Sequence, residues 1–229
     1  MRGDLSLVQL PHIILSFAMT LDGKIATKSG DSSISSEWDK TRTHALRASV
    51  DAVMVGSGTV LSDNPRLDVR YVQGKDPLKV VVDGRLIIPE NSRLVTLFAS
   101  KLIVGTTKAA DPVKLRRLKS AGVKVIECGP GPHVDLLYFL RSLHELGVQT
   151  LMVEGGGELN WHLLKLGVVD EIYATVAPVV VGGVLAKTPV EGDGAESIKT
   201  GFMFKLAGTR VNHDEVVLHY LRVERPQGD

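Results

Sequence analysis

Apolar residues in this chain of 229 residues gather in short runs that alternate with segments of helical periodicity. The runs are rich in valine, isoleucine and leucine and are bounded by turn-forming residues, which is typical of buried strands. Strands are predicted at 12–17, 51–55, 78–82, 102–104, 123–127, 150–153, 171–181, 204–210 and 215–223. Helices are predicted at 37–49, between Asp111 and Gly122, at 134–146, and directly after Gly157.

Local signals support two of the helix starts. Ser36 is suited to cap the first helix, with Asp39 placed to complete a capping box. Asp111 caps the second helix, and Pro112 occupies the first helical position, where a missing N–H costs nothing. A polar turn at 212–214 joins the last two strands.

The alternation of strands and helices predicts an α/β fold with a mixed, mostly parallel sheet of about eight or nine strands and helices on both faces. The closing hairpin requires at least one antiparallel strand. No linker-like stretch divides the chain, so a single domain is predicted over residues 1–229, with its core at about 12–223. The G-x-G-x-x-G fingerprint of a Rossmann fold is missing after the first strand.

Composition excludes several classes of function. A net charge of +1 and an aromatic content of 5% argue against nucleic-acid binding and against attraction to an anionic membrane. The apolar run at 13–19 is too short to span a bilayer. Cys128 is the one cysteine, which excludes an internal disulfide and fits a reducing cytoplasm. The histidines lack metal-ligand spacing, and His44 and His162 are interpreted as packing or surface residues.

The segment 151–158 is the most informative stretch. An apolar strand ends at Glu154, three glycines follow (Gly155, Gly156 and Gly157), and an amphipathic helix begins. Glycines at such a junction let the backbone approach a ligand, and the N–H groups of the new helix can face a phosphate. A nucleotide site with a carboxylate beside it is one reading, and a purely structural turn is the other.

Three further clusters follow strand ends. Residues 18–24 form a turn that places Lys24 beyond the first strand, which is either a ligand contact or a solvated turn. Residues 56–67 carry a glycine pair, with Thr59 and Asp63 on one side of a helical turn and Arg70 nearby. Either these groups bind a phosphate, or they form an ordinary cap and a surface salt bridge.

The third cluster is Asp83–Leu86 at the end of a central strand. Asp83 could accept a hydrogen bond from a ribose hydroxyl, and Arg85 could bind a 2′-phosphate, which would favour NADP over NAD. A plain Asp-Gly turn explains the same residues.

The ordered set of motifs resembles the reductase family of riboflavin biosynthesis, over about His12 to Val223. The matching segments are Met19–Lys24, Gly58–Leu67, Val81–Asp83, Val153–Gly157, and Val169–Glu171 before Ala177-Pro178. The resemblance implies a dihydrofolate-reductase-like fold, usually a homodimer, that uses NADPH, or NADH less well. It further implies reduction of the ribosylamino group of a pyrimidine ribose 5-phosphate to ribitylamino.

The resemblance also implies residue roles. Lys24 and Glu154 match positions at the reacting ribose. Positions that bind substrate match Ser32, Arg47, Leu67 and Arg70. Positions that bind NADPH match Ala18, Thr59, Asp63, Asp83, Gly84, Arg85, Leu86, Gly155, Gly156, Gly157, Glu158 and Leu159, with Gly129 as a further wall of the pocket. Bacterial relatives carry a tryptophan where this chain has Ile34.

Many bacterial relatives are fused to a zinc deaminase, and the signature of that deaminase is absent from this sequence. A stand-alone reductase of the archaeal and fungal type is therefore expected. Its expected substrate is 2,5-diamino-6-ribosylamino-4(3H)-pyrimidinone 5′-phosphate. The alternatives are the deaminated uracil form, a folate reductase on the same fold, and a non-catalytic NADPH-binding module.

Overall fold

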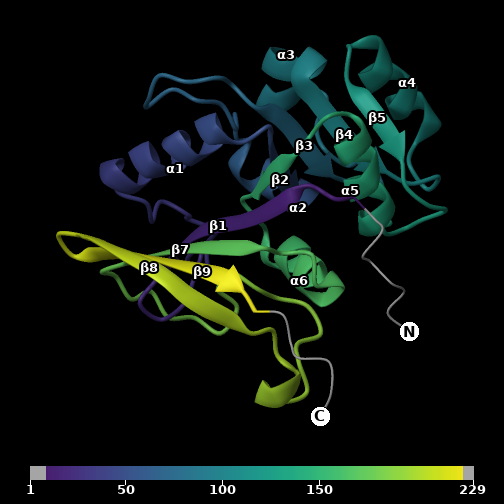
Figure 1. Ribbon diagram of the computed structural model, residues 1–229. Helices are drawn as coiled ribbons and strands as arrows, with labels where there is room; N and C mark the ends of the chain where they lie inside the picture. The colour runs from purple at the N-terminus through teal and green to yellow at the C-terminus, as the bar shows by residue number, and fades with distance from the viewer. Residues whose placement is uncertain (1–8, 224–229) are drawn as a thin grey trace.

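The computed structural model describes residues 9–223, and its strands form one nine-stranded sheet (Figure 1). The order across the sheet is β5-β4-β3-β2-β6-β1-β7-β9-β8. The strands are β1 (His12–Thr20), β2 (Ala52–Gly56), β3 (Leu78–Val82), β4 (Leu102–Thr106), β5 (Lys124–Glu127), β6 (Thr150–Val153), β7 (Glu171–Ala177), β8 (Phe204–Asn212) and β9 (Glu215–Arg222).

All neighbouring strands from β5 to β7 pair in parallel, whereas β9 runs antiparallel to both β7 and β8. The mostly parallel sheet with a closing antiparallel hairpin is therefore confirmed. In Figure 1 the hairpin lies at the opposite end of the sheet from β4 and β5.

Helices cover both faces, as predicted. They are α1 (Glu37–Ser49), α2 (Ser57–Asp63), α3 (Arg93–Phe98), α4 (Pro112–Ser120), α5 (Leu136–Glu145) and α6 (Gly157–Leu166), with 3₁₀ turns at Ala99–Lys101 and Ile198–Thr200. Successive strand residues point to opposite faces, so Met54 packs with the apolar residues of α5 and α6. Val53 and Val55 pack on the other face, with apolar residues of α1 to α4.

Three of the differences between the structure and the sequence predictions have a clear physical reason. Helix α3 was missed because six residues are too few to show a period, and burial of Leu94 and Val95 stabilises it. Strand β7 ends at Ala177 rather than at residue 181, because Pro178 has no N–H to donate. Helix α2 begins at Ser57, so Thr59 lies inside its first turn and does not cap it.

The capping box predicted for α1 is only half formed. The Ser36 side chain accepts a hydrogen bond from the Asp39 backbone N–H, as predicted. The Asp39 carboxylate instead lies buried and accepts hydrogen bonds from Ser35, Arg42 and Thr175. Asp39 thus links α1 to β7, a contact that local sequence cannot reveal.

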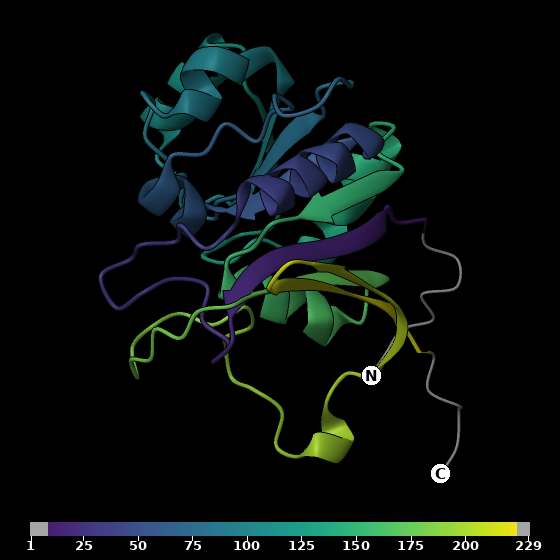
Figure 2. The ribbon, with the colours of Figure 1, turned by 90° about the vertical axis from the view of Figure 1, so that its left-hand side faces the viewer.

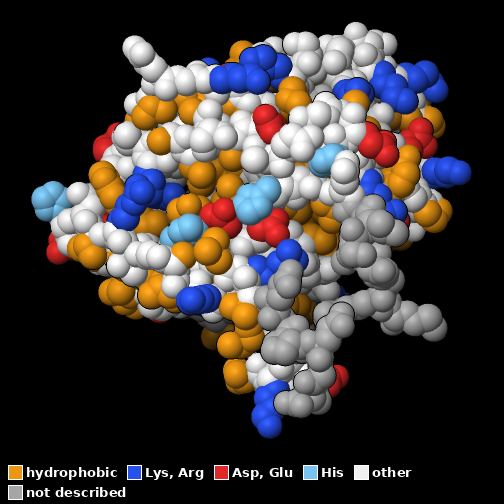
Figure 3. Space-filling view, in the orientation of Figure 1, with side chains coloured by type: hydrophobic (Ala, Val, Ile, Leu, Met, Phe, Trp, Pro, Cys, Tyr) orange, Lys and Arg blue, Asp and Glu red, His pale blue; other side chains and the backbone are white. Residues whose placement is uncertain are grey.

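No helix among residues 9–223 is long and apolar enough to cross a membrane. The face in Figure 3 mixes acidic, basic and histidine side chains, without a broad field of one charge. Figure 2 shows a long irregular segment between β7 and β8 that extends away from the sheet.

Strand β6 positions the site. It comes late in the chain but lies between β1 and β2, so three neighbouring parallel strands end at the same edge. The Gly56 N–H donates to the Gly155 carbonyl, which places the turn after β6 beside the turn after β2. Carboxyl edges of parallel strands are where α/β folds bind ligands.

Candidate active site

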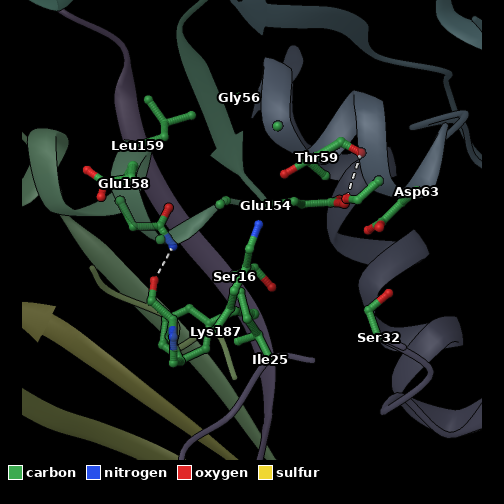
Figure 4. Close-up of a pocket in the computed structure, with 18 of the residues that line it drawn as sticks. Ser16, Ile25, Ser32, Gly56, Thr59, Asp63, Glu154, Glu158, Leu159 and Lys187 are labelled. Carbon is green, nitrogen blue, oxygen red and sulfur yellow. Dashed lines mark hydrogen bonds between the residues drawn. The ribbon is translucent and has the colours of Figure 1, made fainter. Parts of the chain in front are cut away.

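A cavity of about 830 Å³ opens at this edge. Its volume lies in the upper part of the range for small-molecule sites. Thr59 and Asp63 on α2 lie on one side of it, and Glu158 and Leu159 of α6 on the other (Figure 4). Glu154 lies between the two groups (Figure 4). Among the residues expected from the sequence, those that line the cavity are Ala18, Ser32, Arg47, Thr59, Asp63, Arg70, Gly84, Glu154, Gly155, Gly156, Gly157, Glu158 and Leu159.

The three glycines at the start of α6 are tolerated or required for different physical reasons. Gly155 has a φ of +96°, which side-chain-bearing residues rarely adopt. A Cβ on Gly157 would lie 2.7 Å from Glu191 Cγ and 2.8 Å from the Thr188 carbonyl, so close packing requires that glycine. A Cβ on Gly156 would meet only Thr59 Oγ1, at 3.6 Å, an ordinary contact. The protein itself therefore leaves room at Gly156, on the cavity wall.

Helix α6 begins at this turn with free donors. Its first backbone hydrogen bond runs from Asn160 N–H to the Gly156 carbonyl. The N–H groups of the three residues before Asn160 consequently lie outside the helical ladder. With the positive end of the helix dipole, they form a site suited to a phosphate.

Glu154 is held by a two-pronged ion pair with Arg47. Arg47 Nε donates to Oε1 at 2.6 Å, and Arg47 Nη2 donates to Oε2 at 2.7 Å. The two side chains are only 11% and 15% exposed. Burial opposes the charge of Arg47, but the neighbouring Glu154 raises its pKa overall.

His44 and Arg70 complete this side of the cavity. His44 Nδ1 accepts a hydrogen bond from the Arg70 backbone N–H at 3.0 Å. Burial and the positive charge of Arg47 lower the pKa of His44 to about 4, so the ring is neutral at physiological pH. The Arg70 side chain is 48% exposed and donates from Nη1 to Asp68 Oδ1 at 2.5 Å.

Lys24 does not line the cavity, although Ile25 beside it does. The Lys24 ammonium donates to the Ala186 carbonyl at 3.2 Å. Of the four residues that the expected site needs in one pocket, Thr59, Arg70 and Glu154 line the same cavity, and Lys24 does not line it.

Other expected residues also lie outside the lining. Asp83 is 1% exposed and accepts a hydrogen bond from the Ile88 N–H at 2.8 Å, so its carboxylate stabilises a turn. Leu67 and Leu86 are buried, and Arg85 is exposed away from the lining. The loop that contains Gly129 reaches the cavity through Pro132, His133 and Val134 rather than through Gly129.

Sequence reasoning missed part of the lining. The irregular segment after β7 carries no recognisable motif, and it contributes Lys187, Pro189 and Glu191 to the lining (Lys187 is labelled in Figure 4). Asn160 anchors this segment by donating from Nδ2 to the Pro189 carbonyl at 2.8 Å. His44 and His162, interpreted as packing or surface residues, also line the cavity.

The fold and site define a class: an α/β protein with a nucleotide-sized cavity, a helix N-terminus for phosphate, and a fixed carboxylate. Within residues 9–223, no group of three or more histidine, cysteine, aspartate or glutamate side chains could hold a metal ion.

Comparison with known proteins identifies the family. Residues 11–218 match the family described as the RibD C-terminal domain. A relative from Methanothermobacter thermautotrophicus, named 2,5-diamino-6-ribosylamino-4(3H)-pyrimidinone 5′-phosphate reductase, is 39% identical over 92% of this chain and 97% of its own length. This chain therefore belongs to the RibD C-terminal domain family.

Solved structures agree with this assignment. RibD from Acinetobacter baumannii superposes with a TM-score of 0.81 at 25% identity, over 94% of this chain and 58% of that one. The riboflavin biosynthesis reductase Rib7 of Saccharomyces cerevisiae superposes with a TM-score of 0.71 at 25% identity, over 93% and 90% of the two chains. The fold expected from the resemblance is confirmed. The names of the relatives support the classification of this chain as an oxidoreductase.

Proposed function

We propose that this protein reduces the ribosylamino side chain of 2,5-diamino-6-ribosylamino-4(3H)-pyrimidinone 5′-phosphate to the ribitylamino form, with NADPH as reductant. The observation that carries the proposal is the meeting of the glycine turn of α6, the Thr59–Asp63 side of α2 and the Glu154 carboxylate in one cavity. The 39% identity to a relative named for this substrate supports the undeaminated form.

The residues present fit a dinucleotide. The free N–H groups at the start of α6 suit its pyrophosphate, and the space beside Gly156 allows close approach. Thr59 and Asp63 offer hydroxyl and carboxylate groups on the facing wall. NADPH would supply a hydride for the C1′ carbon of the opened ribosylamine.

The protein's own groups orient the substrate. Arg70 and Ser32 suit the 5′-phosphate, and the Glu154 carboxylate suits the hydroxyls of the ribose. Such positioning can be worth roughly 7–11 kcal/mol of the barrier. A role for Lys24 in ring opening is part of the proposal, although its ammonium now bonds the Ala186 carbonyl.

Steady oxidation of NADPH at 340 nm with the pyrimidine substrate tests the reaction. Glu154→Gln and Lys24→Ala should each abolish turnover while circular dichroism stays that of the wild type. Near-normal kcat in either variant contradicts that residue's role. Turnover of dihydrofolate would instead favour a folate reductase. NADPH binding without turnover would favour a non-catalytic NADPH-binding module. A parallel assay with the deaminated uracil form decides the substrate.

The cofactor site has a matched pair of variants. Gly156→Ala should keep the fold and weaken NADPH binding, measured by fluorescence titration, because the methyl group occupies the open space on the cavity wall. Gly157→Ala should mainly lower the unfolding temperature, because its Cβ meets Glu191 and Thr188. Unchanged NADPH affinity in Gly156→Ala would place the pyrophosphate elsewhere. Titration with NADH measures the preference for the 2′-phosphate.

We further propose a cytoplasmic homodimer. Strand β8 is an edge strand, and its exposed Leu206 and Val211 suit contact with a second copy. Sedimentation at micromolar concentration tests the assembly, and a monomer there rejects it.

A further inference from the structure

The loop after β1 and the segment after β7 are joined by backbone hydrogen bonds. Leu21 N–H donates to the Val179 carbonyl at 2.8 Å, and Ile25 N–H donates to the Lys187 carbonyl at 2.9 Å. We call residues 179–191 the strap, because they pass from the end of β7 along this loop to the start of α6. Ile25 and Lys187 both line the cavity, so the joined segments form part of its wall (Figure 4).

Burial contributes little to holding the middle of the strap. Val180, Val184 and Leu185 are 65%, 99% and 90% exposed, so these apolar side chains have little packing to fix them. A segment with few buried contacts opens at a low cost in free energy unless other bonds hold it. Hydrogen bonds at defined points must therefore keep the strap in place.

The end of the strap next to α6 has its own anchors. The Asn160 side chain donates from Nδ2 to the Pro189 carbonyl at 2.8 Å. The Glu191 N–H donates to the Gly157 carbonyl at 3.2 Å. Both bonds connect the strap to the first turn of α6, independently of the loop after β1.

The end of the strap next to β7 is held by the Asp22 carboxylate. Its Oδ2 accepts the Gly182 N–H at 2.7 Å, and its Oδ1 accepts the Val181 N–H at 3.3 Å. Oδ1 also accepts the Thr20 hydroxyl at 2.6 Å. The hydrogen bond from Thr20, followed by those from the two N–H groups, lowers the pKa of Asp22 against the opposing effect of desolvation. The carboxylate is therefore charged at physiological pH, and hydrogen bonds to a charged group are stronger than neutral ones.

Lys24 is connected to this carboxylate from two sides. Its backbone N–H donates at 2.9 Å to the Thr20 hydroxyl, the same hydroxyl that donates to Asp22. Its ammonium donates at 3.2 Å to the Ala186 carbonyl, which belongs to the strap. The next residue along the chain, Ile25, lines the cavity. The place of Lys24 beside the cavity thus depends on the loop and on the strap together.

We infer that Asp22 is a positioning residue, which holds Lys24 at the edge of the cavity by tying the loop after β1 to the strap. The inference rests on the proposed function, because Asp22 would act through the role proposed for Lys24 in ring opening. A small displacement of a group from its working geometry can cost a large factor in rate. Since Asn160 and Gly157 anchor the other end of the strap, loss of the tie at Asp22 should leave the glycine turn of α6 in place.

The test compares Asp22→Asn with the matched control Asp193→Asn. An amide has one oxygen, so the NH₂ group of Asp22→Asn would face a backbone N–H of Val181 or Gly182 instead of accepting from it. Asp193 lies just beyond the strap, is 81% exposed and pairs with Lys165. Exposed ion pairs of this kind contribute little, so the control removes the same charge without loosening the strap.

In Asp22→Asn, hydrogen exchange followed by mass spectrometry should become about tenfold faster in residues 20–26 and 179–187 together, and should stay that of the wild type in α6. The kcat for the pyrimidine substrate should fall by about tenfold, while the Kd for NADPH, from fluorescence titration, stays within about twofold. Asp193→Asn should match the wild type in all three measurements.

Unchanged exchange in residues 179–187 of Asp22→Asn overturns the inference, and so does faster exchange with an unchanged kcat. A Kd for NADPH that rises as much as kcat falls also overturns it, because the whole cavity would then have loosened. If Asp22→Asn does not fold by circular dichroism, Asp22→Glu takes its place with the same expected pattern, because the added methylene displaces the carboxylate. Wild-type turnover tests the proposed function separately, and the exchange measurement decides the tie whether or not the wild type turns over.

Discussion

His44 makes the stability of this protein depend on pH in a way that can be calculated. The ring is 3% exposed, and its Nδ1 accepts the Arg70 N–H. Burial, followed by the charges of Arg47 and Arg70, lowers its pKa from 6.5 to about 4, against the opposing effect of Glu154 and Asp68. In the unfolded chain the pKa is the ordinary value, so the unfolded state binds a proton first as pH falls.

The sign and size follow from this difference. Well above pH 6.5 both states are neutral at His44 and the effect is zero. As pH falls through 6.5, stability is lost until the folded state also protonates near pH 4. A difference of 6.5 minus 4 gives about 3 kcal/mol in full. Between pH 7.5 and pH 5 the expected loss from this group is about 2 kcal/mol.

Urea unfolding followed by circular dichroism at pH 7.5, 6 and 5 measures this effect. His44→Asn is the matched control, because its amide oxygen can take the place of Nδ1 and does not titrate. The variant's stability should start lower, owing to lost packing, but fall by about 2 kcal/mol less than the wild type over this range. Parallel losses in the two proteins would refute the assignment of a buried neutral histidine.

Two further predictions concern the core and the cofactor wall. Gly105→Ala should cost about 1–3 kcal/mol in urea unfolding, because its Cβ would lie 2.7–2.8 Å from the Phe139 ring; Gly208→Ala, with nothing within 4 Å, is the control, and equal stabilities would show that the ring relaxes freely. Asp63→Ala should raise the KM for NADPH more than it changes kcat, and an unchanged KM counts against a cofactor role for this carboxylate.

Most elements of the fold could be predicted from local signals. Strand β3 and the strand before the glycine turn have the predicted bounds, and Asp111 caps α4 as expected. The predictions that were wrong concern elements that local signals do not specify. Helix α3 is held by burial of two side chains, and the apolar residues after Pro178 read as strand although the sheet offers them no partner there.

The lining of the candidate cavity could be predicted in part from residues that come after strand ends. Thr59, Arg70 and Glu154 were expected together and share one cavity. Asp83 shows the limit of this reasoning, because a turn carboxylate and a ribose ligand have the same sequence pattern, and its hydrogen bond to Ile88 engages it in a turn.

The sequence alone determined where chains turn and which faces are apolar, because capping, glycine turns and periodicity depend on residues close in the chain. It also determined the family, through motifs in a fixed order. Tertiary structure alone decided that β6 lies between β1 and β2, and that Arg47 pairs with Glu154, 107 positions away. Strand order and buried ion pairs depend on contacts between residues that are far apart in the chain. Such contacts stabilise the protein only once the sheet has formed around them.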